Sequence, residues 1–256
     1  MISELMRNTI KEAALEAADF ILENANNFGD AQFKGRVDMV TKIDLGAEKI
    51  ILDKIRTNFP DHSIVTEESD NKETSSDYRW IIDPLDGTTN FVHSFPFVCV
   101  SIGLEYKGEV ILGAVYNPFM KEYFFAEKGK GAFLNDNPIS VSKNDSLKKS
   151  LLATGFPYKV GDTFERNMDL FSKIYRQTQG IRRAGSAAMD LCYVACGRFD
   201  GYWEFDLNPW DVAAGSLIVK EAGGKLSDFS GNDLDIYGKE IMATNGLIHD
   251  ELLGNF

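Results

Sequence analysis

The chain has 256 residues, of which 44% are hydrophobic and 26% are charged, and its formal net charge at pH 7 is −12. This composition fits a globular protein with one large domain or two small ones. The acidic balance, without a concentrated basic patch, argues against nucleic acid or an anionic membrane as a partner. The sequence has neither an apolar run of the roughly 20 residues that span a membrane nor a signal-peptide pattern, so we expect a cytoplasmic protein.

The first part of the chain predicts two amphipathic helices, over residues 2–26 and 41–58, because apolar residues recur there at helical spacing. The polar segment between them contains Lys34–Asp38, which fits either a mobile lid or a plain connection. Asp44 lies near the start of the second helix. A carboxylate there interacts favourably with the helix dipole, so capping alone is a sufficient explanation for this residue.

Two apolar segments that end in acids follow. Residues 63–66 predict a short strand that leads into Glu67, and the run from Trp80 predicts a buried strand that ends at Asp83. We expect the chain to turn at Pro84, which has a fixed φ and no N–H donor. Gly87 would allow that turn to be tight, and Thr88 or Thr89 would cap the next helix. The segment fits a metal and phosphate site, but it also fits a capped turn whose acids face water.

The pattern then changes to period two and predicts an antiparallel meander, with strands over residues 98–106, 110–116 and 122–126. Beyond it, a polar stretch through Lys149 indicates a boundary between two halves, residues 1–142 and 143–256, which we expect to pack as one compact unit. The second half alternates strands (150–154, 180–184, 202–205, 225–229 and 241–244) with helices (163–178, 185–196 and 209–221). Asn245 is expected to cap a short last helix.

Neither the cysteines nor the histidines form a pattern typical of catalysis or metal binding. Three scattered cysteines make no disulfide framework, and we expect them to pack as buried thiols. We expect each histidine to be structural or exposed. The residues are Cys99, Cys192, Cys196, His62, His93 and His249.

Acids recur instead at the ends of predicted elements, beside turns or helix starts: Asp44, Glu67, Asp83, Asp86 and Asp211. Oxygen ligands suit Mg²⁺, Mn²⁺ or Ca²⁺ and not Zn²⁺, and their dispersion over the chain is typical of a catalytic two-metal site and not of a calcium loop. The nucleotide-binding and nucleophile-elbow glycine motifs are absent from the sequence. The residues therefore indicate a metal-dependent reaction on an anionic small molecule, and we expect it to be phosphorylated.

Five ordered segments resemble the inositol monophosphatase family. The segment Asp83–Phe91 is similar to its first signature, and Trp210–Gly215 with Glu221–Gly224 is similar to its second. Val37–Asp44 and Thr66–Ser69 match two further family segments, and the fifth, Gly185–Ala188, falls with Glu204 where family members contact the polyol. The resemblance covers nearly the whole chain. It implies an α/β, αβαβα five-layer sandwich of the inositol monophosphatase and sugar phosphatase type, and a homodimer.

The resemblance also implies roles for single positions. The metal ligands would be Glu67, Asp83, the carbonyl of Leu85, Asp86 and Asp211, which hold two or three Mg²⁺ ions, with Mn²⁺ as a substitute. The catalytic set would be Thr88, Asp44 and Glu67, with Thr88 and Asp44 orienting and deprotonating the attacking water. The substrate contacts would be Asp86, Gly87, Thr88, Gly185, Ser186, Ala187, Glu204 and Asp211, with the N–H groups of Gly87 and Thr88 on the phosphate.

The implied reaction is the hydrolysis of myo-inositol 1-phosphate to inositol and phosphate by a metal-activated water, without a phosphoenzyme, and with inhibition by Li⁺. Relatives that act on fructose 1,6-bisphosphate, nucleotide phosphates or NADP leave an alternative open. Arg182 or Arg183 would serve a second phosphate, unless they form a structural ion pair. A metal-binding regulatory module without activity is the alternative of a different class.

Overall fold

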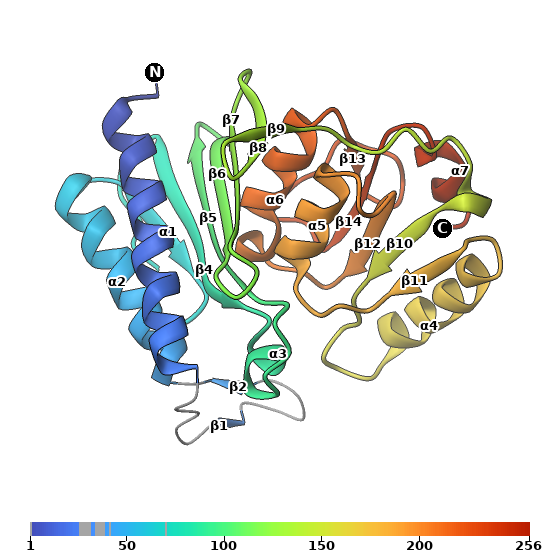
Figure 1. The fold of residues 1–256 in the computed structure, drawn as a ribbon, viewed down its shortest axis with the longest axis horizontal. Helices are drawn as coiled ribbons and strands as arrows, with labels where there is room; N and C mark the ends of the chain where they lie inside the picture. The colour runs from blue at the N-terminus through green and yellow to red at the C-terminus, as the bar shows by residue number, and fades with distance from the viewer. Residues whose placement is uncertain (1, 26–31, 34–38, 41, 70) are drawn as a thin grey trace.

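The computed structural model describes residues 2–25, 32–33, 39–40, 42–69 and 71–256. Figure 1 shows five layers in the order helices, sheet, helices, sheet, helices. The outer pair α1 and α2 covers a seven-stranded sheet, α5 and α6 fill the middle, and α4 and α7 cover the far face of a five-stranded sheet. The predicted α/β fold of αβαβα type is therefore confirmed.

The two N-terminal helices form as their apolar spacing predicts. Helix α1 spans Glu4–Asn24, begins at the N-cap Ser3, and buries one stripe of alanines and isoleucines. Helix α2 spans Lys42–Asn58. Two short strands precede it, β1 (Gln32–Phe33) and β2 (Met39–Val40), which pair antiparallel. The candidate lid Lys34–Asp38 lies outside the described residues.

The first sheet has its strands in chain order: β3 (Ser63–Thr66), β4 (Tyr78–Asp86), β5 (Cys99–Tyr106), β6 (Glu109–Asn117), β7 (Glu122–Glu127), β8 (Gly131–Leu134) and β9 (Asn137–Ile139). Strand β3 is parallel to β4, and every later pair is antiparallel. The meander is longer than predicted because β8 and β9 continue it. Strand β9 was not predicted because it contains Pro138, which disfavours a strand. Proline is tolerated there because β9 lies at the edge of the sheet.

The expected turn at Pro84 was wrong. Strand β4 runs on to Asp86, and its pairing with β5 changes register there: Asp83 lies opposite Ser101, and Asp86 lies opposite Cys99. One extra residue is thus inserted into β4, which is a β-bulge and accommodates a proline that has no N–H for the ladder.

The expected threonine cap was also wrong. The short helix α3 (Thr88–Val92) begins at the N-cap Gly87, whose φ of 94° places it in the left-handed region. A residue with a Cβ is strained in that conformation, so glycine takes the position that a threonine was predicted to hold.

The second sheet has the strand order β11 (Gly180–Arg182), β10 (Leu151–Thr154), β12 (Gly201–Phe205), β14 (Glu240–Thr244) and β13 (Lys225–Ser227). Strand β10 is parallel to both neighbours, whereas β14 is antiparallel to both of its own. The remaining elements are the 3-10 helix η1 (Leu147–Lys149), α4 (Asp162–Tyr175), α5 (Ala187–Ala195), α6 (Pro209–Glu221) and α7 (His249–Leu253).

Asn245 does not cap α7 as predicted, because the N-cap residue is Ile248. The Asn245 side chain instead accepts hydrogen bonds from the N–H groups of Leu247 and Ile248, at 3.0 and 3.2 Å. The asparagine therefore organises the turn that leads into the helix.

The hydrophobic core follows the layers. One cluster lies between α1, α2 and the first sheet, a second around α5 and α6 between the sheets, and a third under α4 and α7. Helix α6 is buried on nearly all sides, because it lies between two sheets. The predicted boundary at residue 142 falls between β9 and β10, and the division into halves stays a prediction. Across the described part of the chain, every helix is too short or too polar to cross a membrane.

Candidate active site

The predicted acids lie where strands β3 and β4 end and where α2 and α6 begin. Because β3 and β4 are parallel, with Thr66 opposite Ile82, the next residues Glu67 and Asp83 leave the ladder side by side. Asp83 is buried, and Asp86 lies half-buried at the end of β4. The sheet therefore brings three acids to one edge.

The two remaining acids come from helix starts. Asp44 lies in the first turn of α2 and is 2% exposed, and Asp211 is in the first turn of α6. We call Asp44, Glu67, Asp83, Asp86 and Asp211 the acidic cluster. Carboxylates in the first turn of a helix are favoured by its dipole, so both positions are electrostatically reasonable before any ligand is considered.

The charges of the acidic cluster change the ionisation of three of its members, Glu67, Asp83 and Asp211. Burial, and then the negative charges of Glu67, Asp86, Asp211 and Asp44, hold the pKa of Asp83 well above its usual range. Burial of the carboxyl end and the charge of Asp211 raise the pKa of Glu67 to about 8, although its side chain as a whole is exposed. Burial and the charge of Asp86 raise the pKa of Asp211 to about 8.

Asp86 is anchored to the start of α5. Its Oδ2 accepts hydrogen bonds from Ser186 Oγ at 2.7 Å and from the Ala188 N–H at 2.8 Å. Burial raises the pKa of Asp86 only to about 6, because these two bonds and the positive charge of Arg183 oppose it. Ser186 is also the N-cap of α5, so one hydroxyl both begins the helix and orients the acid.

Asp211 and Glu204 are held in comparable ways. Asp211 Oδ2 accepts from the Asn208 N–H at 2.7 Å, which forms half of a capping box at the start of α6. Glu204 on β12 accepts from the Tyr202 hydroxyl at 2.6 Å, and burial raises the pKa of Glu204 to about 7. A Cβ on Gly155 would lie 1.9 Å from Glu204 Oε1, so only glycine leaves room for this carboxylate.

The β-bulge of β4 connects the predicted phosphate-binding segment to Asp83. Thr88 Oγ1 donates to the Leu85 carbonyl at 3.1 Å, and the Leu85 N–H donates to Asp83 Oδ1 at 3.0 Å. Leu85 is buried, so its carbonyl is fixed in place by this chain of hydrogen bonds.

Two residues that the sequence did not single out also shape the site. Asn90 Nδ2 donates to the carbonyls of Phe97 and Ala184, each at 2.8 Å, and so ties α3 to the segment before Gly185. Tyr158 is 65% exposed, and its pKa is raised first by burial of the phenol and then by the charges of Asp86 and Asp211, so it lies within electrostatic reach of the acidic cluster. Neither residue follows a local pattern that indicates this contact.

The acidic cluster gathers negative charge, but its carboxylate oxygens are not arranged around a common point as metal ligands would be. Within the described ranges, no group of three or more His, Cys, Asp or Glu side chains is arranged to hold a metal ion as it stands. The donor set nevertheless suits a hard cation, because every member is a carboxylate and the raised pKa values show that negative charge is in excess.

The cysteines are buried or half-buried thiols as expected, but Cys99 lies beside the site, with its Sγ 4.0 Å from Asp86 Oδ2 and 3.6 Å from Ser186 Oγ. Cys99 and Cys192 are buried and free, and Cys196 is half-buried. His93 is exposed, and His62 accepts a hydrogen bond from Trp80 Nε1 at 3.1 Å. His249 is buried between hydroxyl groups.

Comparison with known proteins shows which family the chain belongs to. The family model described as "Inositol monophosphatase family" matches residues 3–256. Inositol-1-monophosphatase of Synechocystis sp. is 50% identical over 243 residues, which is 94% of this chain and 85% of that protein. Nus factor SuhB of Escherichia coli is 42% identical over 253 residues, covering 98% and 95% of the two chains.

Solved structures agree as well. The inositol monophosphatase of Anabaena (Nostoc) sp. superposes with a TM-score of 0.88 at 43% identity, covering 97% of this chain and 93% of that chain. With a matching family model over nearly the whole length and close relatives of known fold, the chain belongs to the inositol monophosphatase family and is a phosphatase.

Proposed function

We propose that this enzyme hydrolyses myo-inositol 1-phosphate to inositol and phosphate with Mg²⁺ as cofactor. The observation that carries the proposal is the acidic cluster, in which carboxylates from β4, from the end of β3 and from the starts of α2 and α6 lie close enough to raise the pKa of Glu67, Asp83 and Asp211. Such repulsion is costly for a protein without a cation, and clusters of this kind are typical of functional sites.

Glu67, Asp83 and the Leu85 carbonyl would hold one Mg²⁺, and Asp83, Asp86 and Asp211 would hold a second. When bound, the ions would supply Lewis-acid polarisation of the phosphate and acidify a water. Mn²⁺ would occupy the same oxygen sites, and Glu67 at the exposed side of the cluster would reach a weaker third ion. Li⁺ is expected to inhibit by competing at the second position.

The protein groups around the ions divide the remaining work. Thr88 and Asp44 would orient the attacking water and accept its proton, and the N–H groups of Gly87 and Thr88 would donate to the phosphate. The Ser186–Asp86 hydrogen bond joins the start of α5 to the proposed metal ligands, where the leaving group would lie. Polyol contacts would come from that region and from β12: Asp86, Gly185, Ser186, Ala187, Glu204 and Asp211.

The test is phosphate release from inositol 1-phosphate with Mg²⁺ and with a chelator, for the wild type and for Asp83→Asn and Thr88→Ala. We expect activity that depends on Mg²⁺ and a large loss in both variants. Full activity of both variants would overturn the assignment. Sedimentation analysis of the same preparation tests the homodimer that the family resemblance implies.

Hydrolysis of a sugar bisphosphate is the second candidate, and one observation favours it. The positive charge of Arg183 acts on Asp86, Glu204 and Asp190, so this exposed guanidinium lies where a second anionic group of a substrate would be recognised. Comparing kcat/KM for inositol 1-phosphate and fructose 1,6-bisphosphate decides between them. A selective loss of bisphosphate hydrolysis in Arg183→Ala, but not in Arg182→Ala, would support the second candidate.

Nucleotide phosphates belong in the same panel of substrates. An inositol monophosphatase of Staphylococcus aureus, SaIMPase-II, is 27% identical to this chain and has been solved with inositol monophosphate and with 2′AMP. That protein therefore binds phosphate esters on two quite different alcohols. Membership of an enzyme family with named phosphatases leaves no role for the metal-binding module without activity.

A further inference from the structure

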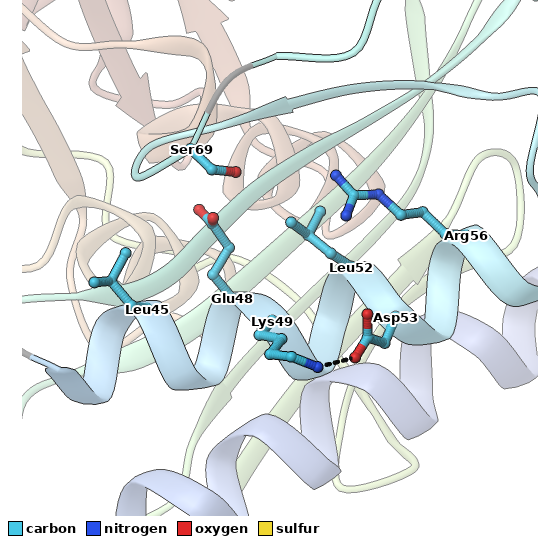
Figure 2. A pocket seen from close by; sticks show the side chains of 7 residues that line it. All are labelled: Leu45, Glu48, Lys49, Leu52, Asp53, Arg56 and Ser69. Carbon is cyan, nitrogen blue, oxygen red and sulfur yellow. Dashed lines mark hydrogen bonds and ion pairs between the residues drawn. The ribbon is translucent and has the colours of Figure 1, made fainter.

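Glu48 is a buried acid that the proposed reaction does not use. It lies one helical turn after Asp44 on α2 and is 3% exposed. Figure 2 shows its side chain rising from α2 toward the segment that carries Ser69, at one side of a pocket of about 320 Å³. A buried carboxylate is costly unless hydrogen bonds satisfy it, so its partners indicate what it does.

The partners of Glu48 lie on both sides of Glu67. Glu48 Oε2 accepts from Thr66 Oγ1 at 2.6 Å and from the Glu68 N–H at 3.1 Å. Hydrogen bonds to an ionised acceptor are among the stronger ones in proteins. A single oxygen of Glu48 therefore fixes the residue before Glu67 and the residue after it, at the point where β3 ends.

Helix α2 thus connects two members of the acidic cluster. Residues i and i+4 of a helix share one face, so Asp44 and Glu48 are both presented to the same side of α2. Asp44 contributes its own charge to the cluster, whereas Glu48 holds the segment from which Glu67 projects.

We infer that Glu48 is a positioning residue, which holds Glu67 in the conformation that binds the divalent cation. This inference rests on the proposed function, because it takes Glu67 as a metal ligand. Groups that orient a ligand without touching the metal typically change metal affinity about 10- to 100-fold when they are removed. A purely structural Glu48 would lower the melting temperature and leave the affinity for Mg²⁺ unchanged.

The experiment is calorimetric titration of the metal-free protein with MgCl₂, without substrate, together with the melting temperature of each variant. Glu48→Gln removes the charge and weakens the hydrogen bonds, and Thr66→Val removes one hydrogen bond without changing charge. Asp53→Asn is the matched control, because this exposed acid lies on the same helix at the rim of the same pocket and pairs with Lys49.

We expect Glu48→Gln to weaken Mg²⁺ binding about 10- to 100-fold. Thr66→Val should weaken it about tenfold, because only one of the two hydrogen bonds is lost. Asp53→Asn should remain within about twofold of the wild type, as surface substitutions usually do. The Thr66→Val result separates positioning from the long-range effect of removing a negative charge.

Wild-type affinity in Thr66→Val, or equal losses in Glu48→Gln and Asp53→Asn, would overturn the positioning role and leave the proposed function standing. If the wild type itself binds no Mg²⁺, the proposed function fails and the role of Glu48 fails with it. Should Glu48→Gln not fold, Thr66→Val still gives the decisive comparison.

Discussion

The acidic cluster and the surroundings of His249 are both buried and polar, but they differ in how well their polar groups are satisfied. His249 is fully buried, with Ser227 Oγ 3.1 Å from Nε2 and Thr244 Oγ1 2.9 Å from Nδ1. Burial lowers the pKa of His249 to about 4, so the ring is neutral at pH 7 and each nitrogen has a hydroxyl partner. The acidic cluster instead gathers like charges, and its pKa values rise.

The contrast separates a polar group that serves the fold from one that serves chemistry. A neutral imidazole between two hydroxyl groups costs little once its hydrogen bonds form, and it needs no ligand. Five neighbouring carboxylates are unfavourable until a cation binds, so the protein gives up stability at that edge in return for affinity. Each of the following changes tests one side of this contrast.

The largest effect is expected from Asp83→Asn. This substitution removes a carboxylate that is 2% exposed and that we propose as a ligand of both metal ions, so we expect activity to fall by more than about 100-fold, the upper limit for residues that only orient a metal ligand. In the presence of a chelator at pH 8, the free energy of unfolding should rise, because a buried carboxyl group whose pKa is raised by burial and by its acidic neighbours is gone. Urea titrations and phosphate-release assays measure both quantities. Loss of activity together with lower stability would show that Asp83 serves the fold.

Ser186→Ala should have the next largest effect. Asp86 would lose its 2.7 Å hydrogen bond while keeping the one from Ala188, and we expect kcat/KM to fall about 10- to 100-fold. Ser216→Ala is the matched control, because this buried hydroxyl on neighbouring α6 has no hydrogen-bond partner among the described residues. The control should keep full activity. Equal losses in the two variants would mean that packing, and not the orientation of Asp86, explains the result.

Much of the site could be predicted because its acids follow strands or begin helices, where local signals are strong. The strand end before Glu67, the buried run that leads into Asp83 and the helix start at Asp211 were all visible in the periodicity. The β-bulge at Pro84 and the left-handed Gly87 were not, because both depend on how β4 pairs with β5. Edge strand β9 was hidden because Pro138 argues against a strand unless its position at the sheet edge, beside β8, is known.

The supporting contacts could not be predicted, since they join residues that are distant in the sequence. Glu48 accepts a hydrogen bond from Thr66, but no local pattern distinguishes a buried acid on a helix from an exposed one. Gly155 makes room for the Glu204 carboxylate, but nothing near Gly155 in the sequence indicates that contact. The i to i+4 relation between Asp44 and Glu48 is the one signal available, and it acquires meaning only when the segment after β3 is seen beside α2.

The His249 side of the contrast is tested by pH. Because the folded pKa of about 4 lies below the unfolded value of 6.5, the unfolded state binds more protons as pH falls through this window, and stability falls with it. Between pH 7 and pH 5 the wild type should lose about 2 kcal/mol more than His249→Gln. Urea unfolding at several pH values measures the difference. Parallel curves for the two proteins would show that His249 is protonated in the folded state.

The smallest effect is expected at the surface next to His249. Lys225 and Asp250 form an ion pair of 2.9 Å, but their side chains are 51% and 87% exposed, so water and salt screen the attraction. We expect Asp250→Asn to change the melting temperature by only about 1 °C, as Asp53→Asn should at the equally exposed pair with Lys49. Calorimetry at low and high salt measures both. A much larger change for Asp250→Asn alone would mean that the attraction between Asp250 and the imidazole, which burial outweighs in setting the pKa of His249, contributes to stability.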